Sequence, residues 1–112
     1  MEEVPRRGTI SIAPEVLVTI ARLTTLAIPG IARLVSPPGV RRLLGRDGVK
    51  IGVVGNSVHV ELHVVTEPDV NMRQIGRQVQ AEVARAIRDL VGMEARSVDV
   101  YIEDVISPSG TQ

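Results

Sequence analysis

The chain has 112 residues, enough for one domain, and 44% of them are hydrophobic, nearly all aliphatic. Thirteen basic and thirteen acidic residues cancel, so no overall charge attracts the protein to nucleic acid or anionic lipid. The absence of cysteine excludes disulfides and thiolate metal sites, and with Tyr101 as the sole aromatic residue a base-stacking surface is not expected.

The two ends of the chain are polar. The N-terminal residues lack the apolar core of a signal peptide, and no apolar run approaches the ~20 residues of a membrane span, which predicts a cytoplasmic chain. We expect flexible tails at residues 1–7 and 107–112 on either side of a single domain over residues 8–106.

The first half of the chain predicts short elements around one helix. Polar and apolar residues alternate from Thr9 to Ile12, which indicates a short strand. Pro14 suits the first position of a helix with a broad apolar stripe, and Pro29-Gly30 ends it. Residues 31–35 can form another short strand, followed by a long Pro- and Gly-rich loop over residues 36–48.

A hairpin follows, with Gly55-Asn56 as its two-residue turn. Glycine at the first central position is typical of a type II′ turn. This turn sets the register of the two strands, because a slip by one residue would send every side chain to the other face. The predicted pairs are Val53 with Val58, Ile51 with Val60 and Val49 with Leu62 on one face, and Lys50 with Glu61 on the other.

The longest regular pattern is a helix from Asn71 to Val91, with Asn71 as its N-cap and Gly92 just past its end. Its apolar stripe, which needs a sheet to pack on, consists of Met72, Ile75, Val79, Val83, Ala86, Ile87 and Leu90. Alternation over residues 98–103 predicts a last strand. Together these elements predict a two-layer α+β domain of order β-α-β-β-β-α-β, with two helices packed on one face of a small mixed sheet.

Three possible metal ligands, His59, Glu61 and His63, share the outer face of one predicted strand. His59 and His63 would lie ~13 Å apart, too far for one ion, and Glu61 already has Lys50 as an expected partner. Asp99 and Glu103 share the outer face of the last strand, but nothing predicts the burial that an acid–base pair needs. We therefore expect a solvated strand face, with no catalytic residue, metal or cofactor.

The basic residues support an alternative function, a small nucleic-acid or anion-binding domain. Three arginines lie in the Gly-rich loop, where the Lys-Ser/Thr ending of a P-loop is absent, and others lie on the second helix opposite its apolar stripe. A surface loop and a solvated helix face are the commoner readings of such patterns. The candidate anion or partner contacts are Arg41, Arg42, Arg46, Arg73, Arg77 and Arg88.

Over residues 8–105 the sequence resembles the alkaline-shock protein family of bacterial envelope-stress proteins. The residues that carry the resemblance are Gly8, Ile10, Ile12, Val16, Ile20-Ala21, Gly30-Ile31, Val70-Asn71-Met72, Gln80, Val83, Gly92 and Val98-Asp99-Val100. The resemblance implies a cytoplasmic, non-enzymatic protein of cell-envelope homeostasis, which self-associates or is held at the membrane by a separate membrane-spanning partner. It transfers no catalytic residue.

The first hypothesis is therefore a non-catalytic interaction or scaffold module. It would assemble with itself or with a protein partner through its sheet, because the exposed edges of a small sheet can pair with a further strand.

Overall fold

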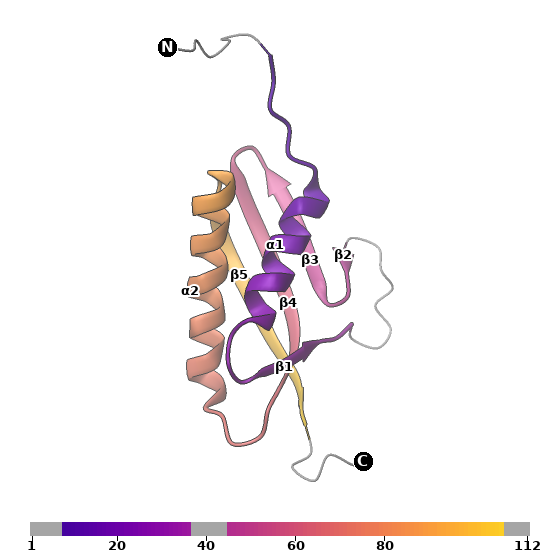
Figure 1. Ribbon diagram of the computed structural model, residues 1–112, viewed down its shortest axis with the longest axis vertical. Coiled ribbons are helices and arrows are strands. Elements are labelled where there is room, and N and C mark those ends of the chain that lie inside the picture. Colours follow the sequence, from indigo (N-terminus) through magenta and orange to yellow (C-terminus); the bar gives the residue numbers. More distant parts are fainter. Residues whose placement is uncertain (1–7, 37–44, 107–112) are drawn as a thin grey trace.

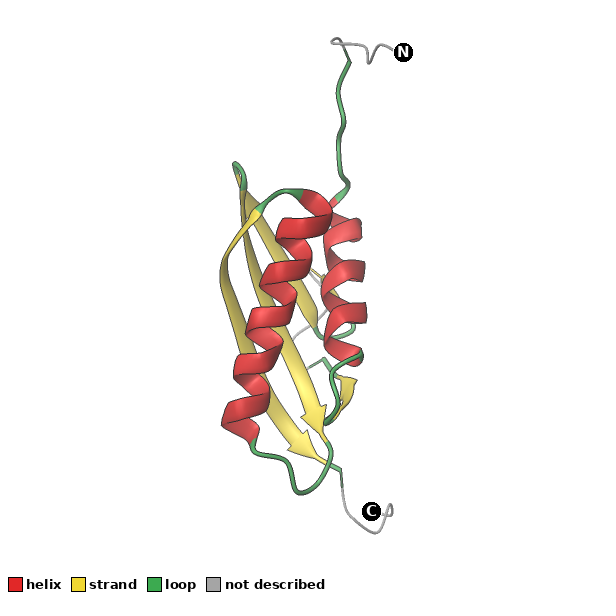
Figure 2. Cartoon of the chain, turned by 60° about the vertical axis from the view of Figure 1, so that its left-hand side comes forward, coloured by secondary structure: helices red, strands yellow, loops and turns green. Residues whose placement is uncertain are grey.

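The structure, a computed structural model, describes residues 8–36 and 45–106 and has two layers (Figure 1). Two helices lie side by side on one face of a five-stranded sheet, whose other face is open (Figure 2). The elements in chain order are α1 (Pro14–Leu26), β1 (Ile31–Leu34), β2 (Gly45–Arg46), β3 (Val49–Val54), β4 (Ser57–Thr66), α2 (Met72–Val91) and β5 (Glu94–Val105). The predicted α+β class and the two-layer packing of both helices on one face of a mixed sheet are confirmed.

Strand β4 is the centre of the sheet. Along one edge it pairs with β5 in parallel, and along the other it pairs antiparallel first with β3 and then with β1. Strands β1 and β3 therefore lie end to end on the same edge of β4, while β2 extends the sheet beyond β3. The α2 helix is the connection between the parallel strands β4 and β5, as parallel pairing requires.

Gly48 lies at the junction where β3 gives way to β1. The His63 N–H donates to the Gly48 carbonyl, and the Val35 N–H donates to the His63 carbonyl, each over 2.9 Å. Gly48 has φ +84°, and a Cβ at this position would lie 2.7 Å from the Val35 carbonyl oxygen. Three backbone segments thus meet at a point that only glycine fits.

The predicted hairpin is confirmed in its register. Val53 pairs with Val58, and Lys50 pairs with Glu61. Gly55 has φ +62°, as the first central residue of a type II′ turn requires. The Asn71 side chain accepts a hydrogen bond from the Gln74 N–H over 3.0 Å, and Gly92 ends α2 in the left-handed conformation, so both predicted caps are confirmed.

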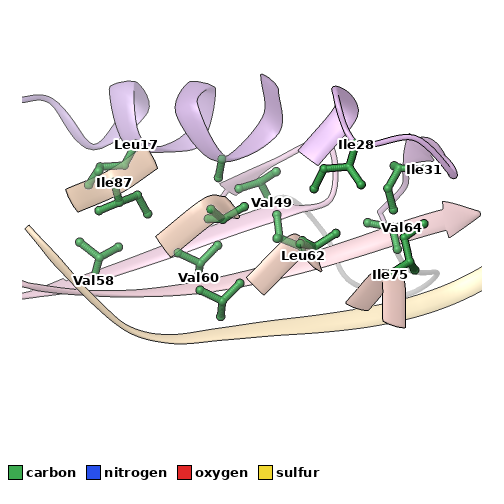
Figure 3. Close-up of a cluster of buried hydrophobic side chains, with 14 residues drawn as sticks. Leu17, Ile28, Ile31, Val49, Val58, Val60, Leu62, Val64, Ile75 and Ile87 are labelled. Carbon is green, nitrogen blue, oxygen red and sulfur yellow. The ribbon is translucent and has the colours of Figure 1, made fainter. Parts of the chain in front are cut away.

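The core lies between the helix layer and the sheet (Figure 3). Because apolar side chains recur every three or four residues on the helices and every second residue on the strands, each element turns one side inward. The fully buried residues from the helices and from β4 include Leu17, Ala21, Val79, Val83, Ile87, Val58, Val60, Leu62 and Val64.

Two details of the prediction are wrong. Residues 9–12 form no strand: they lead into α1 as an exposed segment, and the Ile10 side chain is 92% exposed. Four alternating residues are a weak signal unless a neighbouring strand is there to pair with them. On α2, Met72 and Leu90 are exposed although they continue the apolar stripe, because they lie in the terminal turns of the helix. From α1 onward the predicted order of elements holds, with the two-residue strand β2 added inside the predicted loop.

Candidate functional site

The open face of the sheet carries a small polar network around His63. Its Nε2 lies 2.8 Å from Glu61 Oε2 on the same strand, and its Nδ1 lies 2.6 Å from Glu103 Oε2 on β5. The imidazole also stacks on the Tyr101 ring, with centroids 4.8 Å apart and planes inclined by 13°. The parallel pairing of β4 with β5 sets His63 beside Tyr101 and so brings these side chains together.

This network is built for mutual hydrogen bonding. An ionised carboxylate only accepts, so both contacts are hydrogen bonds at the same time when the imidazole carries two protons. The carboxylates lie on opposite ring nitrogens and therefore do not converge with the imidazole on one point. Within residues 8–36 and 45–106, no three His, Cys, Asp or Glu side chains are arranged to hold a metal ion. The network therefore fastens β5 to β4.

His59 has a separate partner, since its Nδ1 lies 2.9 Å from the Ser97 hydroxyl. Glu61, which we expected to pair with Lys50, instead contacts His63. Sequence reasoning missed the contact between His63 and Glu103, which are 40 positions apart. Only the knowledge that β5 runs parallel to β4 could have found it.

A second feature is a groove of about 410 Å³ between α2 and β5. Its floor combines half-buried apolar side chains of β5 with an uncovered glycine of the helix, and its helix side is basic. The lining residues are Met72, Arg73, Gly76, Arg77, Gln80, Val100 and Ile102. At one end of the groove, the Gln80 side-chain amide donates to the Val98 carbonyl over 3.0 Å.

The predicted arginine contacts do not form one surface in the part of the chain that the structure describes. Arg73 and Arg77 line the groove, whereas Arg88 lies toward the other end of α2, where its Nε donates to the Asp89 carboxylate over 3.0 Å. Arg46 belongs to β2, which lies on the opposite side of the molecule from α2 (Figure 1). Arg41, Arg42 and the side chain of Arg46 lie outside the described residues.

A third feature is the outer side of α1. Val16, Ile20 and Leu23 follow one another at helical spacing and therefore share one side of the helix. This side lies away from the buried side of α1, which is marked by Leu17 and Ala21, and Val16 and Leu23 are 44% and 56% exposed. We call Val16, Ile20 and Leu23 the α1 row. The unusually broad apolar stripe of this helix was the signal for it in the sequence.

In the ranges 8–36 and 45–106, neither helix is long and apolar enough to cross a membrane. This finding leaves the surface features above as the candidates for function.

Comparison with solved structures identifies similar folds at low sequence identity. A copper form of a MamM CTD variant has 13% identity and a TM-score of 0.54, and the match covers 82% of this chain and 98% of that chain. A zinc form of another variant has 13% identity and a TM-score of 0.53, covering 81% and 85%. A third MamM CTD structure gives 13% and 0.54, covering 82% and 99%. At this identity the likeness concerns the fold alone.

No curated protein matches the chain. A family model does: it matches residues 2–107 and is described by a cell envelope-related function. The match includes the whole of the domain described above and agrees with the family that the sequence resembles. The chain belongs to the alkaline-shock protein 23 family.

Proposed function

We propose that this protein is a non-catalytic interaction module of cell-envelope homeostasis. In this proposal it works in the cytoplasm, at the inner face of the membrane, through self-association or by binding a membrane-anchored protein. The cell envelope-related function of its family supports the envelope role.

The observation that carries the proposal is the exposed α1 row. A small monomeric domain gains stability by burying large aliphatic side chains, and single exposed ones are common, but a row along one helix marks a surface that a partner covers. Leu23 is more than half exposed although it lies in the middle of α1, where the sheet and α2 already bury the opposite side.

The polar side chains of the open face support a structural role for that face. His63 is occupied by Glu61 and Glu103, and His59 by Ser97. These groups lie on an exposed sheet surface, whereas catalysis requires a water-excluding cleft in which they would be aimed at a reacting atom.

The proposal is tested by size and by capture. Sedimentation or light scattering over a concentration series should give a rising apparent mass, or affinity capture from the native host's membrane fraction should retain an envelope protein. The double variant Val16→Glu and Leu23→Glu should abolish whichever behaviour is found. Leu90→Glu, which changes an equally exposed leucine on α2, is the control and should leave it unchanged.

A strictly monomeric protein that captures no envelope protein would overturn the proposal. Equal loss in the double variant and in Leu90→Glu would remove the α1 row from it.

A further inference from the structure

Strand β5 is a long strand with one unpaired edge. It runs for twelve residues and pairs with β4 on one side, and no other strand among residues 8–36 and 45–106 borders its second side. An unpaired strand edge presents main-chain N–H and C=O groups that can pair with another extended chain. Natural proteins usually protect such an edge, and here α2 and its side chains stand beside it.

Gln80 shows which groups of β5 point outward. Its side-chain amide donates to the Val98 carbonyl, so this carbonyl faces α2 and the unpaired edge. Along a strand, the main-chain groups of residues two apart point the same way. The N–H and C=O groups of Val100 and Ile102 therefore face the same edge, and both residues line the groove beyond Gln80. The glutamine closes one end of the edge and leaves the next two residues open.

The helix side of the groove provides room and positive charge. A Cβ added to Gly76 would meet no atom within 4 Å, so the helix leaves space at the middle of the groove. Arg73 and Arg77 stand one helical turn apart on the same wall. Neither guanidinium forms an ion pair with a carboxylate within the described parts of the chain. Two exposed cations beside an open strand edge are suited to carboxylates carried by a chain that lies on that edge.

We propose that this groove binds an extended acidic segment of a protein partner, which adds to the sheet as a strand beside β5. The inference rests on the proposed function and deepens it by giving the chemistry of the partner. Segment residues opposite Val100 and Ile102 point toward α2, so acidic and apolar side chains at alternate positions meet the arginines and the space over Gly76. The intervening side chains face the open side of the sheet.

The charges of β5 itself favour a peptide over a polyanion. Asp99, Glu103 and Asp104 are exposed on the same strand and repel a phosphate backbone laid along it. A peptide avoids this repulsion, because its alternate side chains separate the two environments. Lysine or threonine can face Asp99 and Glu103, while glutamate faces Arg73 and Arg77.

The test uses the full chain and a labelled synthetic peptide with glutamate and valine on one face and lysine and threonine on the other. Fluorescence anisotropy should give saturable binding. The double variant Arg73→Glu and Arg77→Glu should weaken it by roughly tenfold or more, as expected for the loss of two charge-assisted contacts. Gly76→Leu should weaken it by filling the groove. Arg85→Glu, a charge reversal elsewhere on α2, should leave it within about twofold.

Methylated peptides test the strand pairing without altering the protein. Methylation of the peptide nitrogens that face β5 should abolish binding, whereas methylation of the intervening nitrogens should have little effect. Equal loss in both series would overturn the proposal. So would an unchanged affinity of the arginine variant, or binding of single-stranded RNA or anionic vesicles that is stronger than that of the peptide and depends on Arg73 and Arg77.

The result is separable from the proposed function. A protein that self-associates or captures an envelope protein through the α1 row but ignores the peptide would keep the proposed function and lose this inference. A protein that binds the peptide but fails both tests of the proposed function would do the reverse.

Discussion

Replacement of Gly48 by alanine should be among the most damaging single-methyl changes in this domain. The left-handed conformation of Gly48, with φ +84°, costs a residue with a Cβ about 1–2 kcal/mol. The new Cβ would also lie 2.7 and 2.8 Å from the Val35 oxygen and nitrogen and 3.0 Å from the His63 oxygen, all main-chain atoms. These atoms cannot move apart without stretching the hydrogen bond from Val35 to His63, and each such bond contributes about 1 kcal/mol. We expect a loss of about 3–5 kcal/mol in the free energy of unfolding.

Two other glycines separate the conformational cost from the clash. Gly55 is also left-handed, with φ +62°, but a Cβ there meets nothing within 4 Å, so Gly55→Ala should cost only about 1 kcal/mol. Gly76 lies inside α2 with open space around it, so Gly76→Ala should stabilise the protein by about 0.5–1 kcal/mol through helix propensity. The same methyl group thus has three different expected effects.

Urea unfolding followed by circular dichroism measures all three variants on one scale, provided that the slope with denaturant stays constant. The reasoning is refuted if Gly48→Ala costs no more than Gly55→Ala, because the clash would then contribute nothing. It is also refuted if Gly76→Ala is destabilising.

Three further predictions use the same unfolding assay or its thermal equivalent. Leu62→Ala should cost about 2–5 kcal/mol because Leu62 is fully buried on β4, whereas Leu90→Ala, at a leucine that is 70% exposed, should change stability by less than about 0.5 kcal/mol; similar losses would mean that the core is wrongly placed. Thr25→Val should stabilise by about 1 kcal/mol because the Thr25 hydroxyl is buried with no hydrogen-bond partner in the described structure, and a loss would indicate that the hydroxyl is bonded. Added zinc should leave the melting temperature unchanged because the carboxylates around His63 do not converge, and a rise that disappears in His63→Ala would contradict this geometry.

The parts of the fold that the sequence predicts well are those constrained twice. The β3–β4 hairpin is an example, because its turn chemistry and the alternation on both faces agree on a single register. The α2 helix is another, with a cap at each end and a long apolar stripe between them. Residues 9–12 offered one weak constraint, and there the prediction of a strand is wrong.

The candidate surfaces were harder to predict because they depend on how distant segments pair. The contact of His63 with Glu103 requires the parallel register of β4 and β5, and the groove requires β5 to be the strand left at the border of the sheet. Local patterns carry no information about either. Arg73 and Arg77 were identified as candidates from their place on the helix, but the sequence could not separate them from Arg88, which lies away from the groove.

The central place of β4 has a consequence for how the molecule opens. Three strands, β1, β3 and β5, depend on β4 for their main-chain pairing, so no sizeable part of the sheet can persist once β4 detaches. Amide protons of β4 should therefore exchange with solvent only when the whole domain unfolds, while those of the short strands β1 and β2 exchange through local fraying. Slow exchange confined to β4 and its bonded neighbours would make this strand the last element to be released.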